Sequence, residues 1–251
     1  MGNKILMICC TMRRPDRIQE MIKSYKATKG SNNTDIIYCL NKEDKRLYEY
    51  EPVLRGEKVI IESPNYQTKM FNIISKELYT DYDYYGLIND DHIFRTMNWD
   101  IELVETVEEM GKGFGLAHAN ALWYDSDVVC RHPSAFIISA NIIKALDYAI
   151  YPELRHFKLD TYFRDLTEPL GLLFYREDIV IEHMHRDVGK AQDDENYQWG
   201  YSGEEQAHGN KHYFLWSKLY ADNDRYRIAR AIKESIANGK GIGNGDCTMG
   251  K

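Results

Sequence analysis

Residues 83–92 read Asp-Tyr-Tyr-Gly-Leu-Ile-Asn-Asp-Asp-His and join an apolar run to a polar ending. The run Tyr84–Ile88 does not alternate with polar residues, which is typical of a strand covered on both faces. Asp90 and Asp91 follow it, and two adjacent carboxylates at the end of a buried strand repel each other and lose hydration. A divalent cation offsets both costs, so the stretch predicts a metal site. A solvated Asn-Asp turn is the alternative interpretation.

The chain around this strand alternates between strand and helix patterns. Apolar runs of the strand kind recur in Ile5–Cys10, Asp35–Leu40 and Val59–Ile61. Between them, apolar residues return every three or four positions, as on one face of a helix. The three sets are Ile18, Met21, Ile22 and Tyr25, then Met70, Phe71, Ile74 and Leu78, then Ile101, Val104, Val107 and Met110. This alternation predicts an α/β, Rossmann-like fold with a mainly parallel sheet flanked by helices, and ligands bind at the carboxyl ends of such strands.

The second half of the chain is less regular and predicts a smaller mixed sheet. Gly113–His118 and Ala135–Ser139 have strand patterns. Leu172–Tyr175 and Ile179–His183 indicate a strand pair with a tight connection between them. Helices are expected over residues 142–149, 203–215 and 222–237. Residues 239–251 contain five glycines and predict a flexible tail.

Composition limits the class of protein. The chain has 251 residues, of which 43% are hydrophobic and 28% charged, and this suits one large α/β domain. A formal net charge of -7 argues against a protein that coats nucleic acid, but leaves a local basic groove open. Five cysteines without a CxxC pair favour reduced thiols. Without a signal segment or an apolar stretch of about 18 residues, we expect a cytoplasmic protein with no membrane anchor.

The motif resembles the metal-site signature of GT-A glycosyltransferases. Residues 83–92, followed by Thr96-Met-Asn-Trp-Asp100, are similar to the strand, the Asp-x-Asp-type motif and the Thr-x-x-Trp-Asp helix start of family-2-like enzymes, including bacteriophage ones. Three more segments resemble, in order, the loop after the first strand, the nucleobase loop and the helix beside the nucleotide: residues 11–17, 40–44 and 65–72. The similarity covers roughly residues 4–197. Because this chain reads Asn-Asp-Asp-His and not a plain Asp-x-Asp, the choice of metal-binding carboxylate stays open.

The resemblance implies a division of roles around the motif. We expect Asp91 to bind the metal and Asp90 to lie nearer the ribose or base. A late ligand is expected from His183 or His185, which lie at i, i+2 near a strand end and therefore point to one face. Carboxylate oxygens suit Mg²⁺ or Mn²⁺, and an imidazole from His92 or a later histidine shifts the preference towards Mn²⁺. Two surface histidines are the alternative interpretation.

The resemblance also implies contacts to a nucleotide-sugar. The cations after the first strand would meet the diphosphate or base and steer an anionic substrate, although exposed cations are commonly just solvated. Asp193 and Asp194 indicate a solvated acidic run, a helix start or part of a lid. The expected nucleotide-sugar contacts are Thr11, Arg13, Arg14, Arg17, Asp44 (to the base), Lys69, Asn72, Asn89 and Asp90.

Asp160 is the expected catalytic base. Residues 156–163 resemble the acceptor-side helix start of inverting GT-A enzymes, in which an Asp deprotonates the acceptor hydroxyl. Asp160 also suits the N-cap of a helix over residues 161–166, and Asp165 and Glu168 are the other candidate bases. Aromatic residues that can stack on sugar or base, or simply pack, are Trp123, Tyr124, Tyr197, Trp199, Tyr201 and Trp216.

These features predict one catalytic domain over residues 1–238, with a nucleotide-binding half at about 1–110 and an acceptor half at about 111–238. The expected activity is metal-dependent transfer of a sugar, with inversion, from a nucleoside-diphosphate donor to a hydroxyl, and a UDP-sugar is the expected donor. A nucleotidyltransferase, a metal-dependent phosphohydrolase and an inactive nucleotide-sugar-binding module are the alternative classes.

The expected acceptor of the sugar rests only on the resemblance to phage enzymes. Some phages glycosylate hydroxymethylated bases in their own DNA, so such a base is the specific hypothesis, and the protein would then work in the host cytoplasm. A glycan or protein acceptor is the competitor. Four cations are candidates for a DNA path, although a solvated helix face suits them equally: Arg225, Arg227, Arg230 and Lys233.

Overall fold

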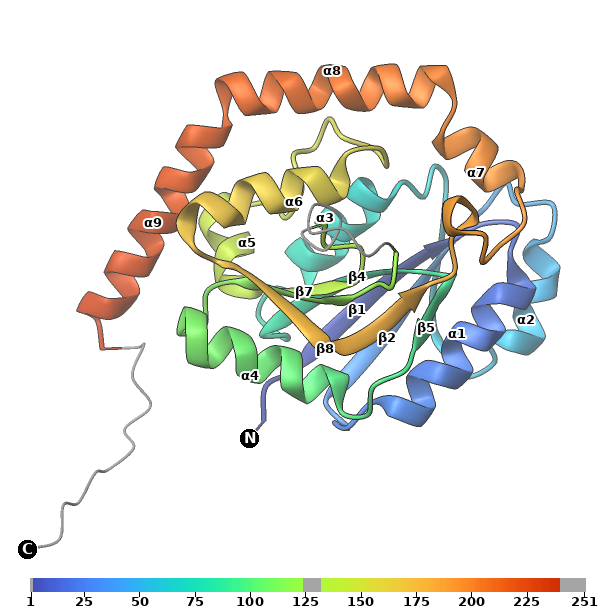
Figure 1. Cartoon of the computed structure of the whole chain (residues 1–251), viewed down its shortest axis with the longest axis horizontal. Coiled ribbons are helices and arrows are strands. Elements are labelled where there is room, and N and C mark those ends of the chain that lie inside the picture. Colours follow the sequence, from blue (N-terminus) through green and yellow to red (C-terminus); the bar gives the residue numbers. More distant parts are fainter. Residues whose placement is uncertain (1, 124–131, 240–251) are drawn as a thin grey trace, which may run out of the picture.

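The structure, a computed structural model, describes residues 2–123 and 132–239 (Figure 1). The expected tail beyond Gly239 and the aromatic residue Tyr124 lie outside the described residues. Within the two described ranges, no helix combines the length and the apolar composition needed to cross a bilayer.

An eight-stranded sheet forms the centre of the molecule, in the order β3-β2-β1-β4-β7-β6-β8-β5. The first four strands in this order run parallel, whereas β7 is antiparallel to both of its neighbours and β5 is antiparallel to β8. The expected α/β fold is therefore confirmed, and its mixed part continues the same sheet. The strands are β1 (Ile5–Thr11), β2 (Thr34–Asn41), β3 (Lys58–Glu62), β4 (Tyr84–Asn89), β5 (His92–Phe94), β6 (Leu116–Asn120), β7 (Phe136–Ser139) and β8 (Leu173–His183).

Helices cover both faces of the sheet, because strand side chains point alternately to opposite sides. Leu6 and Ile8 of β1 join one core with α3, α5 and α6, whereas Met7 and Cys9 join another with α1 and α4. Helices α7 to α9 then arch around the first of these layers (Figure 1). The α-helices are α1 (Pro15–Thr28), α2 (Tyr50–Val53), α3 (Gln67–Glu77), α4 (Trp99–Gly111), α5 (Ala140–Leu146), α6 (Leu159–Thr167), α7 (Glu195–Gly200), α8 (Gly203–Leu219) and α9 (Ala221–Ala237).

Strand β8 corrects one prediction from the sequence. Leu172–Tyr175 and Ile179–His183 are not a strand pair, because a single strand runs from Leu173 to His183. Ala119 and Asn120 of β6 pair with Arg176 and Val180, so the register shifts there and residues 177–179 are left out of the ladder. Such an irregularity inserts residues without ending a strand, although in sequence it looks like a turn. As a result β8 pairs with β6 along its first part and with β5 at its end.

The Trp-Asp pair at the start of α4 is part of the scaffold. Asp100 is fully buried and accepts hydrogen bonds from the Gly30 amide (2.7 Å), the Ser31 amide (3.1 Å) and the Thr34 hydroxyl (2.6 Å). Trp99 is buried beside it. The Trp99-Asp100 pair therefore stabilises the loop before β2. The acceptor positions of the Asp100 carboxylate are occupied by the chain itself.

Candidate metal and nucleotide site

The carboxyl ends of β1 and β4 and the end of β8 meet at one edge of the sheet, next to α7 (Figure 1). Asp90 and Asp91 follow β4 directly, and each is only 4% exposed. His92 begins β5 and stands opposite His183 in the antiparallel ladder. The motif predicted from residues 83–92 is therefore buried, which excludes the solvated turn.

The two carboxylate oxygens of Asp91 have different neighbours. Oδ1 faces His183 Nε2 at 3.1 Å. Oδ2 accepts hydrogen bonds from the Tyr197 hydroxyl (2.8 Å) and from Arg14 Nη1 (3.3 Å). Burial alone would raise the pKa of Asp91, but His183 and Arg14 outweigh burial and hold that pKa well below its usual range. The carboxylate is therefore ionised, as a metal ligand must be.

Two imidazoles lie beside Asp91. Asp91, His92 and His183 are all buried, and each places one possible ligand atom within 4.8 Å of the other two. The Nε2 atom of His92 is buried without a hydrogen-bond partner, and burial lowers the pKa of His92 to about 3, so its ring is neutral. A carboxylate oxygen and an imidazole nitrogen suit Mn²⁺, so Asp91 and His183 fit a divalent cation, with His92 beside them. The sequence prediction named Asp91, His183 and His185 as the metal ligands and considered His92 only as an imidazole that would favour Mn²⁺.

The three histidines of the region are not equivalent. His183 presents Nε2 to Asp91. Nδ1 of His92 accepts a hydrogen bond from the Asn89 amide (3.1 Å), so the neutral His92 ring carries its proton on Nε2 and lies beside the ligand atoms without a free lone pair in this arrangement. His185 is outside the cluster: its Nδ1 accepts from the Asp187 amide (3.2 Å), and its Nε2 lies 3.3 Å from the Tyr201 hydroxyl. Of the two predicted late ligands, the structure thus brings only His183 to Asp91.

Arg14 is buried between carboxylates, and the solvated interpretation of this cation is wrong. Its side chain is 9% exposed. Nη1 donates to Asp90 (2.9 Å) and to Asp91 (3.3 Å), while Nε and Nη2 donate to the two oxygens of Asp194 (2.8 and 2.9 Å). Asp90 also accepts from the Thr11 hydroxyl (2.6 Å), and burial raises the pKa of Asp90 despite the guanidinium beside it. Asp90 therefore faces the β1 loop and not the imidazoles.

Helix α7 adjoins this cluster through its first residues. Asp194 is the N-cap of α7 and accepts hydrogen bonds from the amides of Asn196 and Tyr197 (both 3.1 Å). It is therefore a helix start paired with Arg14, and not part of a solvated acidic run. Arg17 lies 3.8 Å from Asp91 and 3.5 Å from Asp194. Two arginines of the β1–α1 region thus connect the β4 carboxylates to α7.

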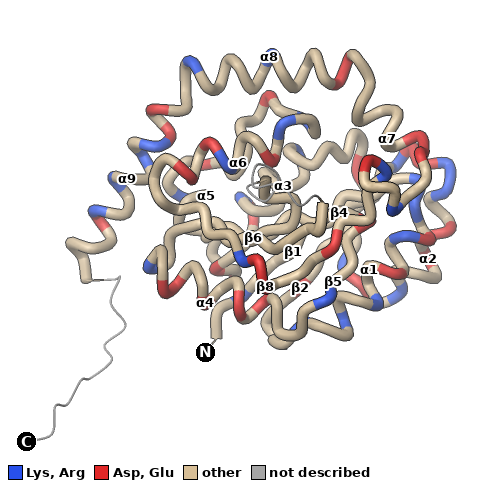
Figure 2. Tube along the Cα trace, viewed as in Figure 1, with Lys and Arg blue, Asp and Glu red and all other residues tan. Residues whose placement is uncertain are grey.

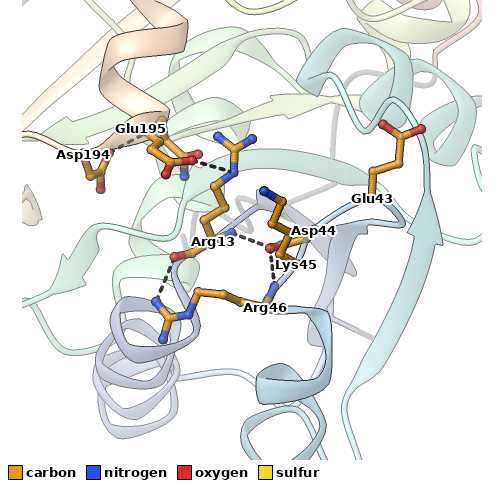
Figure 3. A pocket seen from close by; sticks show the side chains of 8 residues that line it. Arg13, Glu43, Asp44, Lys45, Arg46, Asp194 and Glu195 are labelled. Carbon is orange, nitrogen blue, oxygen red and sulfur yellow. Dashed lines mark hydrogen bonds and ion pairs between the residues drawn. The ribbon is translucent and has the colours of Figure 1, made fainter.

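A pocket of about 360 Å³ opens beside this network, between the loops after β1 and β2 and the start of α7 (Figure 3). Asp44 accepts from the amides of Arg13 (2.5 Å) and Arg46 (2.8 Å), and Arg13 Nε lies 3.3 Å from Glu195. Charged residues of both signs gather around α1, α2 and α7 (Figure 2). The lining residues are Arg13, Glu43, Asp44, Lys45, Arg46, Asp194, Glu195 and Asn196.

Three other residues that were predicted to contact the nucleotide-sugar are instead bound to other parts of the chain. Asn72 binds the backbone of residues 149–150: its amide nitrogen donates to the Ile150 carbonyl (2.7 Å), and its oxygen accepts two amides (2.9 Å each). Lys69 pairs with Glu62 at 3.3 Å, and Asn89 accepts from the Gln67 side chain at 2.7 Å. Only Asn89 of these three adjoins the cluster, through its position at the end of β4.

Asp160 lies within the first turn of α6, and its side chain is 47% exposed. The helix begins after Lys158, so the N-cap interpretation of Asp160 is wrong. One oxygen accepts the Thr161 amide (2.7 Å), and the other lies 3.4 Å from His132 Nδ1. Burial opposes ionisation, but these partners outweigh it and hold the pKa of Asp160 below its usual range. Asp165, an alternative base, is instead paired with Arg164 at 2.6 Å.

Comparison with known proteins identifies the fold. No family model and no curated sequence matches the chain. Among solved structures, the mannosyltransferase PcManGT of Pyrobaculum calidifontis, with GDP-Man and Mn²⁺, matches with a TM-score of 0.58 at 8% identity over 94% of this chain and 76% of its own. Residues 1–349 of S. aureus TarS match with a TM-score of 0.54 at 13% identity, over 94% and 92%.

A third solved structure matches and contains a different set of ligands. It is glucosyl-3-phosphoglycerate synthase of Mycobacterium tuberculosis, with Mn²⁺, UDP and phosphoglyceric acid, at a TM-score of 0.56 and 12% identity, over 84% of this chain and 78% of its own. These three neighbours are GT-A glycosyltransferases. At such low identity the likeness establishes the fold, and the chain therefore has the GT-A fold.

Proposed function

We propose that the protein is a metal-dependent glycosyltransferase that moves a sugar from a nucleoside-diphosphate donor, a UDP-sugar, to a hydroxyl. The observation that carries the proposal is the buried set of Asp91, His92 and His183 at the carboxyl edge of a GT-A sheet. The neighbours solved with Mn²⁺ and a nucleotide or nucleotide-sugar support it. The family-2-like and phage character inferred from the motif is part of the same proposal.

Asp91 and His183 would hold the metal, with His92 beside them. When bound, the metal offsets the charge that develops on the leaving diphosphate. The charged pocket beside the cluster would take the nucleoside, with Arg13 and Asp44 on its wall. Arg14 and Arg17 stand between that pocket and Asp91, where their cationic groups can orient the diphosphate. The proposed catalytic unit covers residues 1–238.

The direct test is to incubate the full chain with Mn²⁺ and a panel of UDP- and GDP-sugars and to measure release of the nucleoside diphosphate. We expect release with a UDP-sugar, its loss with EDTA and its return with added Mn²⁺. Turnover of a nucleoside triphosphate or a phosphoester instead would place the protein among nucleotidyltransferases or phosphohydrolases. Binding of UDP without turnover of any donor would indicate a binding module.

Asp160 is the proposed base for the acceptor hydroxyl. It is ionised and about half exposed, as a base that must meet a substrate requires. We expect Asp160→Asn to lower kcat by roughly 10²–10⁴-fold, the usual contribution of a general base. The affinity for UDP with Mn²⁺, measured by calorimetry, should stay unchanged. Asp165→Asn is the matched control and should keep its kcat. A large loss of kcat in Asp165→Asn, with little loss in Asp160→Asn, would assign the base to Asp165.

We propose a hydroxymethylated base in DNA as the first acceptor to test, with a glycan or protein hydroxyl as its competitor. Two of the four cations expected along a DNA path are already paired, Arg225 with Asp222 (2.9 Å) and Arg230 with Glu234 (2.7 Å). Gel retardation of hydroxymethylated duplex at several salt concentrations tests this acceptor. Binding that does not weaken with salt, or no binding, would favour the competitor.

A further inference from the structure

Tyr197, on helix α7, contacts the proposed metal ligand through its hydroxyl group. Tyr197 is 5% exposed, and its hydroxyl donates to Asp91 Oδ2 at 2.8 Å; the Met184 carbonyl is more distant, at 3.3 Å. The same oxygen of Tyr197 accepts from Arg17 Nη1 at 3.2 Å. A phenol has a single proton, and this geometry directs it to the carboxylate.

This contact gives the two carboxylate oxygens of Asp91 different roles. Tyr197 and Arg14 hold Oδ2 through hydrogen bonds of 2.8 and 3.3 Å, so Oδ1 is left facing His183. A carboxylate can rotate about its Cβ–Cγ bond and exchange its oxygens, and this rotation would turn the ligand atom away from the imidazole. Hydrogen bonds to the second oxygen oppose the rotation, as partners of metal ligands generally do.

The rest of α7 is attached to the same group of residues. Asp194 caps the helix and forms a two-point ion pair with Arg14, whose guanidinium also lies over the Tyr197 ring at 4.4 Å. Arg14 in turn donates to Asp91. Helix α7 therefore reaches Asp91 twice, directly through Tyr197 and indirectly through the Asp194–Arg14 pair.

We propose that Tyr197 is a positioning residue that aims Asp91 at the metal, so that docking of α7 and binding of the divalent cation are coupled. This inference rests on the proposed metal site. Because coupling between two equilibria is reciprocal, a metal ion that binds better when α7 is docked must also stabilise the docked helix. Loss of the Tyr197 hydroxyl should weaken metal binding and reduce that stabilisation.

The first experiment measures the affinity of the full chain for Mn²⁺ alone, by electron paramagnetic resonance of the free ion. We expect Tyr197→Phe to weaken binding by roughly 10-fold or more, within the 10–100-fold range for partners of metal ligands. Tyr201→Phe is the matched control, because it removes a hydroxyl just beyond α7 that lies near His185 and not Asp91. Equal affinities of Tyr197→Phe and the wild type would overturn the proposal.

The second experiment uses only the wild type, so it does not depend on how a variant folds. Hydrogen exchange of the amides in residues 195–200 should slow when Mn²⁺ is added. Exchange that is unchanged while Mn²⁺ binds would overturn the coupling and leave the metal site intact. A wild type that binds no Mn²⁺ would overturn the metal site itself and this inference with it.

Discussion

Replacing Asp91 with Asn should abolish binding of the divalent cation and, with it, turnover of the nucleotide-sugar. The substitution keeps the shape of the side chain but removes the anionic ligand atom that faces His183 at 3.1 Å. We expect Mn²⁺ affinity to fall by more than the roughly 10–100-fold cost of losing an outer partner of a metal ligand. Calorimetric titration with Mn²⁺, followed by the donor-turnover assay, measures both effects.

Asp90→Asn is the matched control for this experiment. Asp90 accepts from Thr11 and Arg14 and does not face the imidazoles, so its replacement should leave most of the metal affinity. His183→Ala should reproduce the loss seen with Asp91→Asn, whereas His185→Ala should not, because both ring nitrogens of His185 have other neighbours. Loss of metal in Asp90→Asn, with binding retained in Asp91→Asn, would reverse the division of roles between the two carboxylates.

Replacing Arg14 with Ala should lower the free energy of unfolding by about 3–5 kcal/mol, the usual cost of leaving buried charges without their partner. Its guanidinium bonds to Asp90, Asp91 and Asp194, and the first two of these carboxylates are each 4% exposed. Urea unfolding at neutral pH measures the change. Arg46→Ala is the control: Arg46 pairs with Asp16 and Glu49 at the surface, and exposed pairs contribute about 1 kcal/mol or less.

The pH dependence of this loss provides a second readout. Burial already raises the pKa of Asp90, so protonating this carboxyl favours the folded state, and that stabilisation disappears as pH rises through the folded-state pKa. Without the Arg14 guanidinium, which lowers it, the pKa of Asp90 should rise further. The difference in unfolding free energy between wild type and Arg14→Ala should therefore be largest at neutral pH and narrow as pH falls. A difference that is constant with pH would show that lost packing, not uncompensated charge, dominates.

The sequence was sufficient to predict the frame of the site, because the frame depends on local patterns. The uninterrupted apolar run before Asn89 predicts a doubly covered strand, and the structure confirms it in β4 and in the parallel strands beside it. A ligand site at the carboxyl ends of the strands follows from that parallel topology. The prediction that Asp91 lies near a late histidine needed the resemblance as well, since nothing local relates residues 91 and 183.

The parts that could not be predicted depend on contacts between distant segments. Arg14 and Asp194 each look like surface charges in sequence, and only the folded chain brings them together across 180 positions. Asn72 looks available for a ligand until its amide is seen binding the backbone of residues 149–150. The choice between His183 and His185 required the orientation of each ring, which spacing of i, i+2 does not provide.

The ladder between β5 and β8 places His92 directly opposite His183, with ring centroids 4.6 Å apart. Adjacent strand residues point to opposite faces, so a one-residue slip of either strand would move one imidazole to the far side of the sheet. Loops elsewhere can change length without altering the spacing of the two imidazoles. An insertion or deletion within either strand would alter it. Length variation among natural relatives should therefore be excluded from β5 and from the end of β8 while it remains tolerated in the loops between them.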